Sequence, residues 1–514
     1  MSNRPPRFNR LLILILVSVP IFIGALDLTV VSAVLPHVIY DLEIPVQTGL
    51  DDAAWLVSGY LLAYSVAMTF MGHLSDIYGR RKIYLLALTI FAVGSYLVAV
   101  AHTWPTRFAL RAHYLLSSGR PDPARITLLS LIVARMIQAF GGGAMVPVGM
   151  ALVGDLYPAG ERAKPLGMIA AVDTAGWAVG HFYGGVITYH LEWRTIFWLN
   201  LPICAIAFLL IYFVLRELEQ KTVIQRMDWL GAALITLALT ALNLGLGVSS
   251  ETGGGVVEQQ VAWPPYATFA VILAVFLIGA FLWRQARAEH PLVPLHLFQN
   301  RNLSAASLAN FLVGYSLFVA IANVPLFINT IVAETLDQGA LDSGLILLAL
   351  TVPMAMAAFP GGWLTARIGY RWPALAGLVV ALAGFGLMNH WWVDTTYATM
   401  VPHLAVTGLG FGLVMAPIAA AVVDAAPAEY RGTASALVII FRLVGMTIGV
   451  SSITTYGLHR VEMLSSRLLS ATADLVEIAR VSMEVAATVI DEAFLIAGIA
   501  CALAIYPIIR LRVH

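Results

Sequence analysis

Four charged side chains interrupt long apolar stretches of this chain: Asp27, Arg135, Asp173 and Arg442. A charge at the centre of a bilayer is unfavourable by about 2.5–3.5 kcal/mol on insertion scales, so residues of this kind usually serve a function. Asp27 is the single carboxylate in the middle of the first apolar stretch. A buried carboxylate close to an arginine can bind and release a proton. A structural ion pair is the alternative reading of Asp27.

Arg135 cannot give up its charge inside a membrane. We therefore expect it to face a water-filled cavity or an acid, and Asp27 is the natural candidate. A purely structural role for Arg135 is the alternative.

Asp173 and Arg442 are separated by 269 residues, which is also the spacing of an internal repeat described below. Symmetry-related positions of two halves can meet in one conformation and part in another. We predict that these two charges approach each other, directly or through water, in one state only. The alternative is that Asp173 and Arg442 each form an ion pair with a different nearby residue, which the sequence cannot distinguish.

The elements that must position these charges are membrane helices. The chain has 514 residues, of which 60% are hydrophobic and 11% charged. No soluble core needs so much apolar sequence, so we expect an all-α, multi-pass membrane protein. Fourteen segments are long enough to span a bilayer, at about residues 11–36, 52–75, 82–101, 126–153, 165–189, 194–215, 229–248, 265–284, 303–332, 342–366, 373–391, 402–423, 433–458 and 490–511.

The positive charges predict the orientation of these segments. With the N-terminus in the cytoplasm, nineteen of the 29 Lys and Arg residues fall in cytoplasmic segments and eight in outer ones. This bias predicts a protein of the cytoplasmic membrane with both termini inside. The balance of 29 basic and 29 acidic residues gives no sign of nucleic-acid binding, and we expect the two cysteines to be free thiols.

An internal repeat divides the chain. Gly72, Gly79 and Arg81 recur 290 positions later, and the pattern Asp155-x-x-Pro158-x-x-x-Arg162 recurs 269 positions later from Asp424. We predict a six-helix bundle at residues 1–216, two linker helices at 217–300 and a second six-helix bundle at 301–514. The spacing between the repeats falls from 290 to 269 residues, so the first half has additional residues between these two patterns. We place this insertion at 101–125, on the outer side.

The loop at residues 72–82 reads G-x-L-x-D-x-x-G-R-R-K. It resembles the loop 2–3 signature of the major facilitator superfamily, whose fold has two six-helix halves around a central cavity. Asp76 needs a cation or a helix N-terminus, and we predict that it lies near residues 431–433 when the protein is open to the outside. We assign the conformational gate to Gly72, Asp76, Gly79, Arg80, Arg81 and Asp155.

The segment from Asp173 carries a strip of glycines, which permits close helix packing. It resembles the exporter signature G-x-x-x-G-P-x-x-G-G, with His181 in place of the proline. His181 is a titratable ring in the membrane, although a hydrogen-bonded structural histidine is the alternative. The strip consists of Gly176, Gly180, His181, Gly184 and Gly185.

The two extra helices and the L-D-x-T-V-V pattern around Asp27 resemble the fourteen-helix drug:proton antiporter branch. The second half, for example Asn389–Asp394 and Gly408–Pro417, is similar to the mycobacterial triacylglyceride exporters, which work beside a lipoprotein. This resemblance implies lipid export, an extracytoplasmic lipoprotein partner and long outer helices near residues 456–492.

The residue chemistry alone predicts only a proton-linked carrier. The fold that the resemblance implies adds alternating access, driven by protonation of Asp27. Few ionisable groups lie in the spans, so the cargo is expected to be apolar, a lipid or a hydrophobic drug. An importer or symporter of a small metabolite is the alternative. The sequence shows no nucleophile, metal-binding or acid–base motif, so we expect neither an enzyme nor a cofactor.

Overall fold

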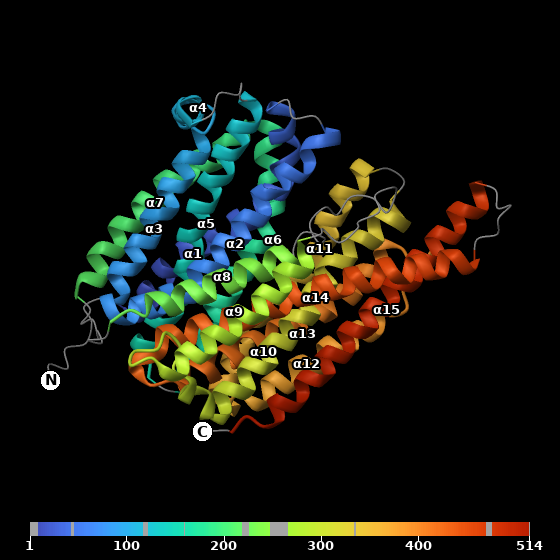
Figure 1. The fold of residues 1–514 in the computed structure, drawn as a ribbon. Helices are drawn as coiled ribbons and strands as arrows, with labels where there is room; N and C mark the ends of the chain where they lie inside the picture. The colour runs from blue at the N-terminus through green and yellow to red at the C-terminus, as the bar shows by residue number, and fades with distance from the viewer. Residues whose placement is uncertain are drawn as a thin grey trace.

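The computed structural model describes residues 9–42, 46–116, 122–158, 160–217, 226–246, 266–333, 336–468 and 475–512. Regular structure in these ranges is entirely helical (Figure 1). The six long helices of the first group are α1 (Arg10–Asp41), α2 (Val46–Tyr78), α3 (Arg80–Ala99), α5 (Pro123–Leu156), α6 (Ala163–His190) and α7 (Arg194–Val214). Those of the second group are α10 (Arg301–Phe327), α11 (Leu336–Ile368), α12 (Arg371–Met388), α13 (Tyr397–Ala425), α14 (Arg431–Leu468) and α15 (Leu475–Ile509).

Three further helices lie outside these two groups. The linker helices α8 (Trp229–Leu246) and α9 (Ala267–Arg287) pack on each other, and α8 also packs on α2 and α14. The short α4 (Trp104–Leu116) follows α3. Short turns of other helix types lie at Leu215–Glu217, Leu295–Gln299, Ile328–Val332 and Ala428–Tyr430.

Each of the fourteen expected spans coincides with a long helix, and thirteen helices in the described ranges are long and apolar enough to cross a membrane. The remaining expected span is α6, in which the side chains of residues 178 and 181 lie outside the described part of the structure. The structure encloses α6 between α1 of the first group and α11 of the second. In the described structure α6 is therefore a contact helix between the two groups.

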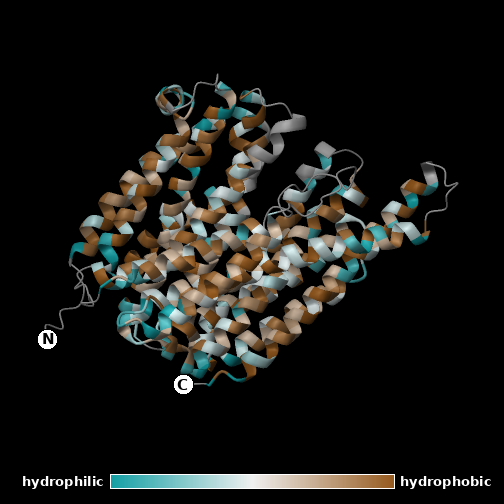
Figure 2. Ribbon diagram, viewed as in Figure 1, coloured by the Kyte–Doolittle hydropathy of each residue, from teal (hydrophilic) through white to brown (hydrophobic). Residues whose placement is uncertain are grey.

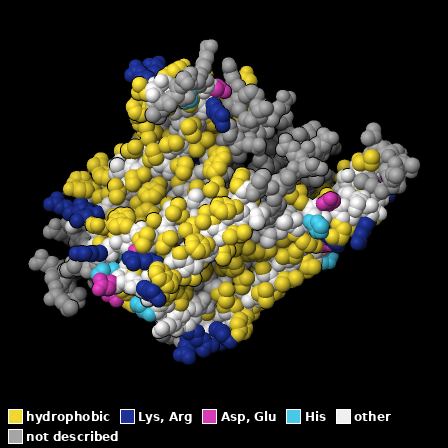
Figure 3. All heavy atoms as spheres, in the orientation of Figure 1, with side chains coloured by type: hydrophobic (Ala, Val, Ile, Leu, Met, Phe, Trp, Pro, Cys, Tyr) yellow, Lys and Arg dark blue, Asp and Glu magenta, His cyan; other side chains and the backbone are white. Residues whose placement is uncertain are grey.

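Both ends of the described chain lie at the same end of the molecule (Figure 1). We call this the basic end, since it carries Arg10, the loop from Arg80 and Arg510, and we call the opposite one the far end. Hydrophilic residues gather at the basic end while apolar residues fill the helices between the ends (Figure 2). The surface between the ends is largely apolar (Figure 3), as a lipid-exposed surface requires.

The two groups touch at the basic end and separate toward the far end, along α6 and α11 (Figure 1). A Cβ atom on Gly167 of α6 would lie 2.7 Å from the carbonyl oxygen of Ala358, and one on Gly362 of α11 would lie 2.5 Å from a carbonyl oxygen of α6. Eighteen residues toward the far end, five helical turns away on the same faces, lie Gly185 of α6 and Gly344 of α11. Neither has an atom within 4 Å of such a Cβ. Among the described residues, the two groups are therefore in contact at the basic end and apart at Gly185 and Gly344 toward the far end.

Candidate functional site

Asp27 of α1 is fully buried and forms an ion pair with Arg135 of α5. Arg135 Nη2 also donates to the backbone oxygen of Asp27 at 3.1 Å. Gln138, one turn along α5, donates through Nε2 to Asp27 Oδ1 at 3.0 Å and accepts from Arg135 Nη1 at 2.7 Å. This contact confirms the predicted pairing of Arg135 with Asp27, and it lies wholly within the first helix group. A buried charge with these partners avoids the penalty of an isolated one.

Three residues that the sequence analysis missed complete the surroundings of this pair. The guanidinium of Arg135 lies 4.1 Å from the ring centre of Tyr60, in a cation–π contact. Asn200 Nδ2 donates to Ser95 Oγ at 3.1 Å and lies 3.4 Å from Asp27 Oδ1. Of these three residues, Asn200 could have been recognised in the sequence, because it is the sole amide side chain in the apolar helix α7.

Asp173 of α6 and Arg442 of α14 form the second charge pair, and it joins the two helix groups. Asp173 Oδ2 lies 3.5 Å from Arg442 Nη2, and both side chains are largely buried. Asp173 Oδ1 is buried without a hydrogen-bond partner among the described residues. A cavity of about 20 Å³ beside the pair, lined by Asn310 and Met415 among others, has room for one water molecule. The predicted approach of the two charges is confirmed, and its restriction to one state stays a prediction.

The two charge pairs are linked by direct packing of α1 on α6. Cβ atoms on Gly176 and Gly180 would lie 2.6 Å and 2.5 Å from backbone oxygens of α1, so α6 can approach α1 this closely only with glycine there. Thr29 Oγ1 donates to the backbone oxygen of Trp177 at 3.0 Å. Thr29 is two residues from Asp27, and Trp177 is one turn from Asp173. The contact of α1 with α6 therefore lies between the two charge pairs.

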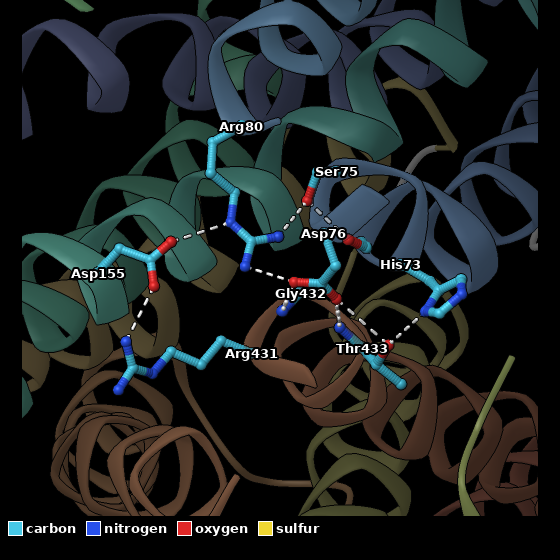
Figure 4. Close-up of polar contacts among 9 residues, drawn as sticks. His73, Ser75, Asp76, Arg80, Asp155, Arg431, Gly432 and Thr433 are labelled. Carbon is cyan, nitrogen blue, oxygen red and sulfur yellow. Dashed lines mark hydrogen bonds and ion pairs between the residues drawn. The ribbon is translucent and has the colours of Figure 1, made fainter. Parts of the chain in front are cut away.

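At the basic end, Asp76 of α2 caps the N-terminus of α14 (Figure 4). Its carboxylate accepts from the backbone N–H groups of Gly432 and Thr433 at 3.0 and 3.1 Å and forms an ion pair with Arg80. A carboxylate is favourable there because the helix N-terminus is positive and has free N–H groups. His73 Nδ1 lies 3.1 Å from Thr433 Oγ1. The predicted position of Asp76 near residues 431–433 is confirmed, and the link of this contact to the state open to the outside stays a prediction.

Ion pairs between repeat-related residues close the same end. Asp155 lies 3.1 Å from Arg80 Nε and 2.9 Å from Arg431 Nη1 of the second group (Figure 4). Arg162 Nη1 lies 2.7 Å from Asp424 Oδ1 of the second group. Asp424 is the repeat mate of Asp155, and Arg431 is that of Arg162, so each half contributes an acid and an arginine to the other. The basic end is therefore closed by two reciprocal charge contacts.

Gly72 and Gly79 have separate roles in this closure. A Cβ atom on Gly72 would collide with the backbone of Gly432 and lie 3.0 Å from the Cβ of Ala436, so any larger side chain would separate α2 from α14. Gly79 has φ of 95°, a conformation that glycine adopts without penalty, and it forms the turn from α2 to α3.

Arg81 contacts α7 in the described part of the structure. Its guanidinium is 4.4 Å from the ring centre of Tyr212 of α7, within the first helix group. Of the predicted gate residues, the structure brings Gly72, Asp76, Arg80 and Asp155 to the second group.

Tyr370 occupies in the second half the position of Arg80 in the first. Its hydroxyl donates to Asp424 Oδ2 at 2.5 Å. Burial, together with this hydrogen bond, raises the pKa of the Tyr370 hydroxyl above its ordinary value. The phenol therefore keeps its proton and donates to the same acid that Arg162 pairs with.

The prediction of a close-packed glycine strip on α6 was correct only in part. Gly176 and Gly180 pack on α1, and Gly184 is buried. Gly185 faces open space, because the two groups have separated at that depth. The side chain of His181 lies outside the described part of the structure.

The arrangement combines one enclosed charge pair, one pair across the groups and a closed basic end. Within the described ranges no three His, Cys, Asp or Glu side chains are grouped as a metal would require. A buried carboxylate paired with an arginine loses the ion pair when it binds a proton. Such a change can alter the contacts between the two groups.

Comparison with known proteins identifies the family. The sequence profile of the Major Facilitator Superfamily matches residues 17–450 and 306–512, so the chain belongs to this superfamily. A triacylglyceride transporter of Mycolicibacterium smegmatis is 32% identical over 465 residues, covering 88% of this chain and 77% of that one. The multidrug transporter protein MdtP of Bacillus subtilis is 29% identical over 451 residues, covering 88% of this chain and 76% of that one.

The fold agrees with that assignment. A solved proton:xylose symporter superposes with a TM-score of 0.60 at 13% identity, covering 96% of this chain and 94% of that one. The chain is therefore a multi-pass membrane transporter with the all-α fold of the superfamily.

Proposed function

We propose that this transporter exports apolar molecules, lipids such as triacylglycerides or hydrophobic drugs, by proton-coupled alternating access. The basic end faces the cytoplasm in this proposal, so the structure corresponds to an outward-open state. Residues 1–216 and 301–514 act as the two moving halves, and residues 217–300 connect them. The cytoplasmic membrane is the proposed location, with both termini inside.

The observation that carries the proposal is the pairing of Asp27 with Arg135 inside the first half. Protonation of Asp27 would release Arg135 from its carboxylate and alter the packing of α1 on α6. Because α6 also carries Asp173, the change would reach the contact with Arg442 between the halves. Asp27, Arg135, Asp173 and Arg442 are thus the proposed coupling residues.

The composition of the opening supports an apolar cargo. Residues 174–190 of α6 and 343–366 of α11 include no Asp, Glu, Lys or Arg. Phe182 of α6 and Leu345 of α11, both toward the far end, are 60% and 50% exposed. Such walls offer a polar solute few partners, which a specific sugar or metabolite site would need.

The names of the relatives support a lipid as the first candidate and a drug as the second. The mycobacterial relative is named a triacylglyceride transporter and the Bacillus relative a multidrug transporter. The long α14 and α15 support a partner outside the membrane. With 38 and 35 residues they reach about 57 and 52 Å, against about 30 Å for the bilayer core. Their far ends project from the helix bundle (Figure 1), where an extracytoplasmic lipoprotein could receive the cargo.

The experiment is lipid analysis of the purified protein followed by transfer in proteoliposomes under a pH gradient. Triacylglyceride, a hydrophobic drug and a small sugar are offered as cargo in parallel. We expect co-purified neutral lipid and gradient-dependent movement of the first or second cargo. Gradient-dependent movement of the sugar alone would overturn the proposal.

A further inference from the structure

The short helix α4 lies across the direction of the spanning helices at the far end. Figure 1 shows α4 nearly end-on, while α3 and α7 beside it run in the plane of the view. Four residues, 100–103, connect it to α3, and it packs on α5. Thr106 is buried and its Oγ1 donates to the backbone oxygen of Ala101 at 2.7 Å, which ties α4 to the end of α3. The helix therefore lies at the depth where an apolar span ends.

The side of α4 opposite Thr106 is apolar and uncovered. Trp104, Phe108 and Leu115 follow one another at helical spacing and fall within about 40° on the helix circumference. They are 51%, 70% and 86% exposed. A soluble surface rarely keeps three large apolar side chains in one exposed row.

Arginines run along one edge of this row. Arg107 and Arg111 are both exposed, one turn apart, and residues 101–116 contain no acid. Figure 3 shows basic and apolar side chains together over this end of the first helix group. Neither arginine is paired with an acid in the described contacts, so the edge is open to an anionic partner.

We propose that α4 is an interfacial anchor that lies in the leaflet at the far end, the outer leaflet in the orientation proposed above. Trp104, Phe108 and Leu115 enter the boundary of the acyl chains, and Arg107 and Arg111 bind the phosphates of anionic lipids. An amphipathic helix with basic residues beside an apolar face binds membranes in this way. Anionic headgroups add about 1 kcal/mol of attraction, about fivefold in binding, for each arginine close to the surface.

The position of α4 indicates that the partner of its apolar row is the lipid bilayer. The row of apolar side chains begins where the apolar span α3 ends, so the bilayer boundary is already adjacent to it. Trp and Tyr are enriched at this depth of membrane proteins, and α4 has Trp104 at its start and Tyr114 near its end. The anchor would hold the first helix group at a fixed depth while the second moves against it.

The test places a nitroxide label at single cysteines on α4, in the full chain with Cys204 and Cys501 changed to alanine. Positions 108 and 115 report on the apolar row, and position 107 is the matched control on the same helix. Vesicles contain phosphatidylglycerol and phosphatidylcholine. We expect the ratio of oxygen to nickel-chelate accessibility to be several-fold higher at 108 and 115 than at 107. Equal nickel access at 107 and 108 would mean that the row faces water, and low access of both oxygen and nickel at 108 would mean that protein covers it. Either result would overturn the proposal.

A second measurement tests the arginines. A fluorophore at position 115 is quenched by nitroxide-labelled phosphatidylglycerol or phosphatidylcholine. We expect stronger quenching by phosphatidylglycerol, and we expect the variant with Arg107→Gln and Arg111→Gln to lose this preference. A preference that survives in the variant would refute phosphate binding by these arginines. Both substitutions are on the exposed surface, so the fold is retained.

Discussion

Gly167 and Gly185 lie on the same face of α6, and the same substitution at each should shift the transporter in opposite directions. A Cβ at position 167 would lie 2.7 Å from the oxygen of Ala358 and 3.0 Å from the Cβ of Ala416. Overpacking of this kind costs about 1–3 kcal/mol, and it applies only while the basic end is closed. Gly167→Val should therefore shift the population toward the inward-open state by about 5- to 150-fold.

Gly185→Val should have the opposite effect. Its side chain meets nothing within 4 Å in the present state, so it adds no clash there. When the far ends of α6 and α11 close, Gly185 and Gly344 are the surfaces that must meet, and a valine would hold them apart. The two variants change helix propensity alike, so their difference reports the contact alone. Gly386→Val on α12 is a neutral control, because its Cβ also meets nothing within 4 Å.

The assay is the distance distribution between spin labels at Tyr189 of α6 and Leu345 of α11, which are 84% and 50% exposed. We expect Gly167→Val to enrich the short distance and Gly185→Val to remove it. If Gly167→Val keeps the wild-type distribution, then packing of α6 on α11 does not stabilise this state. A short distance that remains fully populated in Gly185→Val would show that the far ends do not close at this glycine.

Two further predictions concern charged residues, one a single carboxylate and the other an ion pair. Asp76→Asn removes the charge-assisted hydrogen bonds to Gly432 and Thr433, each worth about 1.5–3 kcal/mol, so the same spin labels should report a shift toward inward-open, and unchanged distances would refute the role of this cap. Asp173→Arg and Arg442→Asp should each lower transport, while the double exchange should restore part of it. Additive losses without rescue in the double-mutant cycle would show that the two charges act separately.

Charges and repeats were predictable from the sequence, because both are specified by residue type and spacing. Asp27 is the single mid-helix acid of its span, which made it the expected partner of Arg135. The repeat spacing related Asp173 to Arg442, and the structure places them in contact. The same spacing relates Asp155 to Asp424, and it could have predicted the reciprocal ion pairs of the basic end.

Neutral polar partners and the conformational state were not predictable. Asn200 lies near Asp27 from α7, and Ser95 of α3 accepts hydrogen bonds from Asn200 and Gln138. A single hydroxyl or amide in an apolar span does not reveal its partner. Gly185 belongs to the same strip as Gly176, yet one packs and the other faces open space. A carrier must use one sequence for both states, so the sequence specifies the contact surfaces and not which of them are closed.

Proton coupling through Asp27 is the central claim, and cargo-dependent proton movement tests it most directly. Purified protein is reconstituted in vesicles with a pH-sensitive dye inside, and cargo export is measured with the internal pH. Asp27→Asn is compared with Asp41→Asn, a carboxylate on the same helix that pairs with Arg194 at 2.6 Å near the far end. Wild type and Asp41→Asn should move cargo and protons together, while Asp27→Asn should insert normally and move neither. Normal gradient-driven export by Asp27→Asn would contradict the account.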